Sequence, residues 1–529
     1  MKIPAVIVLV IAFISCQQEG LSQEHTVSYW GKDLQPGQYD VGFRTLFTYD
    51  KSRSAIPLAD WDGNLTFNQE EGKGRQMQIN VWYPAEGKGA PLRYGHYIQL
   101  LGQQTNFSPN GSASKDLAKK IFIEQTNALG GNGNFTFDHL EQLSKLKTNA
   151  YLQAPAIDTK FPLLLFPNGG SPAYQSIMCE YLASHGYVVA AVVLKGQFSS
   201  TIDVSARGLE MGVDDLQYTL NQLVELDNVD RNRMGLMANA IESSICTALA
   251  AKNKLIKALI SLEGGLLSRF EQKLLGETNF YTPTAISMPI LAIYAPHPAI
   301  SPSFIEHLQY SSRYFLHFPG MTEFHFLNYG LLEQESPNII GNPKGDTKAG
   351  FEWAAKLSLK FLDAMLKDKA ESKMFFDKLE IPQAASEVID TAFSLPALPT
   401  PPNITLLKNL FITEGMQAID SIYQSLRVEN PQVFPQAFYK EFRDWLAWKK
   451  DPDYQFRGQL YAMAVASFPS SAIAHYYRAY YAEKTGEHTL ARKHYQLALD
   501  MIPEDEDPTL TSKKRKVLQE EAQTALARL

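Results

Sequence analysis

Three residues of the chain have the order of a nucleophile, acid and base set, but the first of them cannot react. Ala240 lies in the stretch 237–241 (Met-Ala-Asn-Ala-Ile), between an apolar strand-like run and a helix-like run. Glu263 follows the next strand-like run, and His325 follows the last one. In such a set the acid orients the imidazole, which takes the proton of a serine at the turn. The methyl group of alanine has no lone pair with which to attack an ester.

The same chemistry needs N–H donors for the negative oxygen that forms during acyl transfer. Gly169 and Gly170 follow the apolar run 161–166 and are expected to form the loop that supplies one donor. The backbone N–H of Ile241 is expected to supply the other. These residues complete a candidate site around position 240.

Two other histidines are rival bases. His317 lies within a strand-like run and is expected to be structural. His297 follows another strand-like run, at a position where loops often contact a substrate. His325 is preferred to both because it comes after the final predicted strand.

The elements that position these residues alternate along the chain. Strands are predicted at 41–44, 77–84, 161–166, 187–194, 234–238, 259–262, 289–294 and 314–318, and helices at 172–185, 213–224, 243–252 and 351–367. Strands that are apolar throughout, separated by amphipathic helices, indicate a mostly parallel sheet covered on both faces. The predicted fold class is therefore α/β.

The stretch 230–243 resembles the strand and nucleophile turn of platelet-activating factor acetylhydrolases and dienelactone hydrolase-like enzymes, R-I-G-x-x-G-H-S-x-G-G. The strand half matches well, and Ala240 stands where the family has its serine. Ala238 and Asn239 replace Gly and His, and Glu242 and Ser243 replace the closing glycines. The resemblance covers about 36–367 and rests on the order of its motifs. It implies an α/β-hydrolase fold with Glu263 as triad acid and His325 as base.

Loss of the nucleophile leaves three hypotheses open, so enzymatic activity is undecided. Removing a serine nucleophile costs on the order of 10⁶ in turnover. The first hypothesis is a pocket that binds an ester, acyl, glycan or peptide-like ligand without turnover. The second is an active carboxylester hydrolase with a shifted nucleophile or a histidine-activated water. Ser243 and Ser244 are not expected to be that shifted nucleophile, because they more naturally cap the following helix. The first hypothesis would be contradicted by another hydroxyl or thiol within hydrogen-bond reach of His325. The third is an interaction scaffold, in which the C-terminal tail binds partners and the hydrolase-like domain is only a platform.

The N-terminus resembles an export signal. Met1-Lys2 is followed by the apolar run 3–14, which is shorter than the ~20 residues that span a bilayer. Ser15-Cys16 resembles the lipobox of bacterial lipoproteins, so residues 1–23 are predicted to be a signal peptide and Cys16 to be lipidated. The alternative is ordinary cleavage near Ser15 or Ser22. We expect a periplasmic or outer-membrane lipoprotein, attached by its lipid anchor.

Composition argues against several partners and cofactors. The net charge is -7 and there is no long basic run, which argues against nucleic acid. The cysteines beyond the signal peptide, Cys179 and Cys246, form no zinc-like spacing with histidine and are expected to be buried. The sequence therefore predicts neither metal nor cofactor.

The chain is predicted to contain two domains. Residues 24–395 form the hydrolase-like domain, with 85–155 as an insertion or lid, and 396–404 form a proline-rich linker. The remainder, 405–529, looks helical and repeats itself. Tyr461, Ala464 and Pro469 recur 34 positions later as Tyr495, Ala498 and Pro503. This period resembles the tetratricopeptide repeat, and the tail either holds a peptide or protein partner or packs against the first domain.

Overall fold

The computed structural model of the chain describes the residues around the candidate site and most of both predicted domains. The described residues are 34–53, 74–87, 89–104, Phe107, 112–130, 134–168, 170–196, 201–279, 281–333, Ile340, 343–400, 402–448, 454–505, Leu510 and 512–529. The predicted signal peptide with Cys16, and Gly169, lie outside them. Within these ranges, no helix has the length and apolar character needed to span a bilayer.

One mixed sheet organises the first domain, in the order β10-β9-β8-β7-β6-β4-β5-β2-β1-β3. Its strands are β1 (Asp40–Asp50), β2 (Arg75–Ala85), β3 (Ala150–Leu152), β4 (Phe161–Leu165), β5 (Val188–Val192), β6 (Val229–Asn239), β7 (Ile256–Leu262), β8 (Ile290–Tyr294), β9 (Arg313–His317) and β10 (Thr391–Leu395). Strands β4 to β9 are mutually parallel, whereas β2 and β10 join antiparallel at the two sides. The predicted α/β class and mostly parallel sheet are confirmed.

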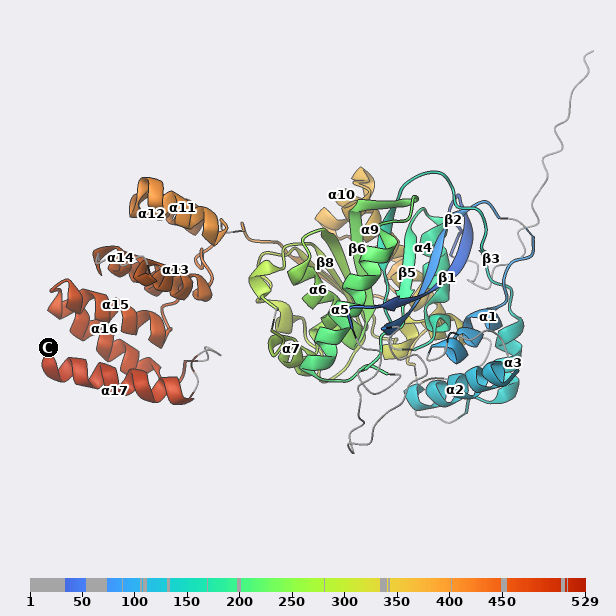
Figure 1. Cartoon of the computed structure of the whole chain (residues 1–529), viewed down its shortest axis with the longest axis horizontal. Coiled ribbons are helices and arrows are strands. Elements are labelled where there is room, and N and C mark those ends of the chain that lie inside the picture. Colours follow the sequence, from blue (N-terminus) through green and yellow to red (C-terminus); the bar gives the residue numbers. More distant parts are fainter. Residues whose placement is uncertain are drawn as a thin grey trace, which may run out of the picture.

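Helices cover both faces of this sheet because successive strand side chains point in opposite directions. On one face, strand residues such as Ile260 pack with α4 (Ser176–Ser184) and α9 (Thr347–Leu366). On the other, residues such as Leu259 pack with α5 (Ala206–Leu223), α6 (Ile241–Lys252) and α7 (Arg269–Gly276). Figure 1 shows α5 and α6 in front of the strands.

The region 85–155, predicted as an insertion or lid, is largely helical. It contains α1 (Tyr94–Gln99), η1 (Leu100–Gln103), α2 (Ser112–Gly130) and α3 (Phe137–Lys145), and ends in β3, which pairs with β1. Its aromatic side chains Tyr94, Tyr97 and Phe135 are buried in the core that also contains α4. These rings therefore hold the insertion onto the sheet.

Short helices and the end of the first domain complete the architecture. They are η2 (Pro172–Tyr174), η3 (Gly265–Leu267), η4 (Pro283–Ala285), η5 (Pro302–Ile305), η6 (Glu323–Phe326), α8 (Tyr329–Leu332), α10 (Ala370–Lys378) and η7 (Gln383–Ala385). Strand β10 was not predicted, because none of its five residues is fully buried and they lack a continuous apolar run.

The C-terminal region is all-helical, as predicted. It contains α11 (Ile404–Glu414), α12 (Met416–Arg427), α13 (Gln436–Trp448), α14 (Tyr454–Ser467), α15 (Ala472–Lys484), α16 (His488–Met501) and α17 (Ser512–Arg528). Both ends of α16 fall 34 positions after those of α14, and the repeated tyrosines Tyr461 and Tyr495 are both buried. The helices thus follow the sequence period, while the tetratricopeptide assignment stays a prediction.

Candidate functional site

Ala240 lies at a strained turn between β6 and α6. Its φ of 46° and ψ of -132° form a conformation that residues other than glycine rarely adopt, at a cost of roughly 1–3 kcal/mol. Gly265 packs so closely on this turn that an added Cβ would lie 2.1 Å from the Ala240 carbonyl oxygen. The sharp turn on which hydrolases present a serine is therefore formed here around a methyl group.

The serines after the turn do not replace the missing nucleophile. Ser243 is fully buried, and its hydroxyl donates to the Ala238 carbonyl at 3.2 Å and accepts from Ser261 at 3.1 Å. Ser244 is also fully buried. Ala240, the residue at the N-cap of α6, forms no side-chain cap. The expectation that these serines cap the helix is wrong, because their hydroxyls are directed into the interior.

Two adjoining cavities meet at Ala240. The larger has a volume of about 440 Å³ and the smaller about 360 Å³. Leu129, Glu323 and Phe324 also line both. The larger cavity has polar side chains in its walls, which include Glu263, Glu271, His297 and Thr322. The smaller has mainly apolar walls, which include Tyr174, Ile202, Val204, Ile241 and Leu327. Together they form one cleft with an acidic end and an apolar end, which we call the elbow cleft.

Glu263 lies at the acidic end, directly after β7. Only 8% of the residue is exposed, and its carboxyl makes no hydrogen bond to the described part of the chain. Burial raises the pKa of Glu263 well above its ordinary value, and repulsion from Glu323, Glu271 and Glu242 raises it further. The predicted acid thus faces the cleft, but other carboxyls surround it.

Two of these neighbouring carboxyls also line the cleft. Burial raises the pKa of Glu271 to about 8, with repulsion from Glu242 and Glu323 adding to the shift and a hydrogen bond from Ser268 opposing it. Burial also raises the pKa of Glu323, although His297 opposes that shift. The lining of the larger cavity contains no lysine or arginine among the described residues. Sequence reasoning did not identify Glu271 or Glu323 as site residues.

His325 is buried beside the cleft and does not line either cavity. Its Nδ1 accepts from the Thr322 N–H at 3.2 Å and lies 2.7 Å from the Thr322 hydroxyl, in a capping box of η6. Its Nε2 has no hydrogen-bond partner in the described part of the chain. Burial lowers the pKa of His325 to about 4 against an opposing effect of the Ile340 backbone, so the ring is neutral at pH 7.

The predicted set is therefore only partly assembled in this structure. Ala240 and Glu263 share the larger cavity. No hydrogen bond or ion pair joins Glu263 to His325 within the described residues. The role of His325 as a base stays a prediction that this geometry does not support.

The rival histidines have separate surroundings. His297 is exposed at the rim of the larger cavity, and its Nδ1 accepts from the Ala299 N–H at 3.2 Å. His317 ends β9, where its Nδ1 lies 2.6 Å from the Asp390 carboxylate and its ring packs on Tyr294. Since His317 lines neither cavity, only His297 is placed to touch a ligand of the elbow cleft.

The predicted N–H donors differ in availability. The Gly170 N–H donates to the side chain of Asn168 at 3.1 Å and is therefore occupied. Ile241 begins α6, so its N–H has no acceptor within the helix, and the residue lines the smaller cavity. Gly169, the remaining predicted residue, lies outside the described residues.

Metal ligands and reactive thiols do not add to this site. In the described part of the chain, no group of three or more His, Cys, Asp or Glu side chains is arranged to hold a metal ion. Cys179 and Cys246 are buried and free, as expected, and burial raises the pKa of both thiols. The chemistry of the cleft therefore depends on its carboxyl, hydroxyl and apolar groups and on the His297 imidazole.

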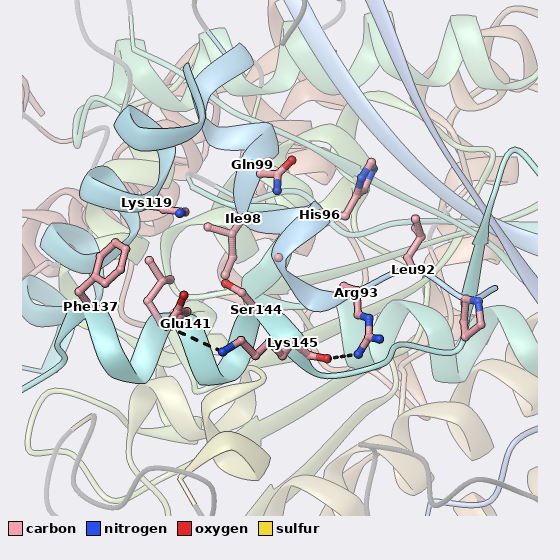
Figure 2. Close-up of a pocket in the computed structure, with 13 residues that line it drawn as sticks. Leu92, Arg93, His96, Ile98, Gln99, Lys119, Phe137, Glu141, Ser144 and Lys145 are labelled. Carbon is pink, nitrogen blue, oxygen red and sulfur yellow. Dashed lines mark hydrogen bonds and ion pairs between the residues drawn. The ribbon is translucent and has the colours of Figure 1, made fainter. Parts of the chain in front are cut away.

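A separate cavity of about 580 Å³ lies among α1, α2 and α3 (Figure 2). Basic side chains line it, including Arg93, Lys119 and Lys145. Arg93 donates to the Lys145 carbonyl at 2.5 Å, and the Lys145 ammonium lies 3.8 Å from Glu141. None of the predicted site residues lines this cavity, so it is distinct from the elbow cleft.

The parallel strands, the strained turn after β6 and the helices on both faces define an α/β-hydrolase fold. Among solved structures, the chain is similar to a ferulic acid esterase from Streptomyces cinnamoneus, with 17% identity and a TM-score of 0.47. The match covers 68% of this chain and 98% of the esterase chain. No family model and no curated protein matches the chain.

Proposed function

We propose that the protein binds a small organic ligand in the elbow cleft and does not hydrolyse it. The single observation that carries this proposal is the backbone of Ala240, which keeps the strained turn of a hydrolase beside an open cleft. Strain of this kind persists only where the surrounding structure maintains it, and it is concentrated at functional sites. Because the Ala240 side chain is a methyl group, which cannot attack a substrate, this turn favours binding over covalent chemistry.

The neighbouring groups also favour binding over turnover. A serine hydrolase needs an acid that is ionised and orients the imidazole. Here burial and three neighbouring carboxyls raise the pKa of Glu263, while His325 is held by Thr322. An acid and a base in these states do not form the relay that acyl transfer requires.

A second candidate function follows from the Thr322 hydroxyl. It lies 2.7 Å from Nδ1 of His325, which can accept its proton, and Thr322 lines the larger cavity. This arrangement favours the hypothesis of a shifted nucleophile. Such a contact was expected to contradict binding without turnover, and that condition is met here. We nevertheless place hydrolysis second because the same hydroxyl accepts the His325 backbone N–H in the capping box, and the pKa of His325, about 4, makes it a weak base.

Hydrolysis of p-nitrophenyl acetate by the wild type, Ala240→Ser and Thr322→Val tests the two candidates. We expect the wild type to remain at the buffer rate and Thr322→Val to match it. Ala240→Ser should gain little, far below the factor of about 10⁶ that a complete triad supplies, because His325 does not line the cleft. Wild-type turnover that is lost in Thr322→Val or His325→Ala would establish the second candidate and reject the first.

A further inference from the structure

We infer that the ligand of the elbow cleft is a small organic cation with an apolar substituent, such as an arylalkylammonium ion. This inference rests on the proposed function, because it names the ligand class of the same cleft. It follows from one buried carboxyl without a partner, from the sign of the charges around it and from the apolar cavity beyond Ala240.

Glu263 is the group that most needs a partner. A buried carboxylate is costly unless it is paired or hydrogen-bonded. Glu263 is more than nine-tenths buried and lines the larger cavity, yet it has no hydrogen-bond partner in the described part of the chain. An Oε2 atom of Glu271, also on the cavity wall, is buried and similarly unpaired. A donor that enters the cavity would give the Glu263 carboxyl a partner.

The charges around Glu263 determine which donor fits best. Carboxyls act on it from three elements: Glu242 from α6, Glu271 from α7 and Glu323 from η6. His297, from the loop after β8, is the titratable group that opposes this negative charge on Glu323. When these carboxyls are ionised, as Glu271 becomes above about pH 8, the potential is negative in a partly desolvated space, where it attracts a cation more strongly than in bulk water.

The rest of the cleft fits an organic cation better than an inorganic one. Within the described residues these carboxyls are not arranged to hold a metal ion. Beyond Ala240 the cleft continues into the smaller cavity, whose walls include Tyr174, Ile202 and Leu327. The cavity volumes of about 440 and 360 Å³ lie in the range of small-molecule sites. An ammonium group at the carboxyls would therefore place an apolar substituent against these side chains.

Calorimetric titration with three related compounds tests the inference: 4-phenylbutylamine, 4-phenylbutanol and 4-phenylbutanoate. At pH 9 we expect the amine, which is still mostly charged, to bind at least about tenfold more tightly than the alcohol, because charge-assisted hydrogen bonds are the stronger kind. The carboxylate should bind most weakly. The preference for the amine should decrease at pH 6, because protonation of Glu271, whose pKa is about 8, removes negative charge.

Variants locate the effect within the cleft. Glu263→Gln should weaken amine binding about tenfold and leave alcohol binding unchanged, since it removes charge and little volume. Glu323→Gln should act in the same direction and provides a second variant if the first fails to fold. Glu277→Gln is the matched control, because Glu277 is exposed just after α7 and does not line the cleft. It should bind all three compounds as the wild type does.

The outcomes separate this inference from the proposed function. Undetectable amine binding, equal binding of amine and alcohol, or unchanged amine binding in both cleft variants would overturn the inference. Binding of the alcohol as tight as that of the amine would leave ligand binding intact and reject only the cation. Failure of the proposed function would instead appear as hydrolysis of p-nitrophenyl acetate by the wild type.

Discussion

At residue 240 the backbone stores strain that the side chain does not use for catalysis. A φ of 46° at an alanine is unfavourable because its Cβ crowds the neighbouring peptide oxygen. In a hydrolase this conformation exposes the nucleophile, and here it exposes a methyl group to both cavities. The surrounding structure, including Gly265, must maintain the turn.

The first prediction concerns this strain. Ala240→Gly should raise the free energy of unfolding by about 1 kcal/mol, because relief of roughly 1–3 kcal/mol of strain exceeds the entropic cost of glycine. Ala238→Gly, two residues earlier in β6, is the control. The control should lower the free energy of unfolding by about 1–2 kcal/mol, because it removes a buried methyl group and makes the unfolded backbone more flexible. Urea unfolding measures both, and equal destabilisation by the two variants would show that position 240 is not strained.

The sequence predicted part of the site at this scale. Ala240 and Glu263 could be placed because each follows a strand that is apolar throughout. The orientation of His325 could not, because it depends on a capping box with Thr322 in a four-residue helix. The convergence of Glu271 and Glu323 on Glu263 depends on how α7 and η6 pack, which no local pattern shows. The only available signal was Glu323 two positions before the predicted base.

At the scale of elements, the cleft is formed where the turns after β6 and β7 pack together. Both turns contain residues with positive φ. Ala240 is the one after β6, and Glu263 and Gly264, with φ of 70° and 98°, are those after β7. Gly265 follows and lies against the Ala240 carbonyl. In open α/β sheets ligands bind beyond the carboxyl ends of the strands, and these packed turns form part of the cleft wall there.

A prediction about stability tests this contact between the two turns. Gly265→Ala should lower the free energy of unfolding by about 1–3 kcal/mol, because its Cβ would overlap the Ala240 backbone. Gly276→Ala, at the end of α7, is the matched control, because an added Cβ there meets no atom within 4 Å. The control should be neutral or slightly stabilising. Chemical denaturation compares them, and an unaffected Gly265→Ala protein would show that the two turns do not pack as described.

Element types were more predictable than the sheet edges. The central strands and the helices between them carry strong apolar patterns, and the structure contains them, although some begin earlier than predicted. The helix α5 begins at Ala206 and not at residue 213, and β6 begins at Val229 and not at residue 234. The β10 strand was missed because an exposed antiparallel edge does not need a continuous apolar run. The sequence marked 85–155 as an insertion or lid, but the return of β3 to the sheet was not predicted.

At the scale of the whole molecule, the buried apolar side chains form clusters on either side of the linker. The two clusters of the sheet domain contain residues up to Leu395, whereas the two clusters of the tail begin at Ile404. Among the described residues, none of these clusters contains side chains from both regions. Figure 1 shows helices α11–α17 beside the sheet domain. Among the described residues, the elbow cleft is lined only by the first region, so the proposed ligand would contact no side chain of the tail there.

The most direct test of the account asks whether the full-length protein contains any activated nucleophile. An excess of a fluorophosphonate, which modifies activated hydroxyl groups, is incubated with the wild type, and the intact mass is measured. A methyl group at position 240 and buried hydroxyls at Ser243 and Ser244 predict no stoichiometric adduct. One adduct per chain, mapped to Thr322 or another residue of the cleft, would contradict the account and identify the protein as an active hydrolase.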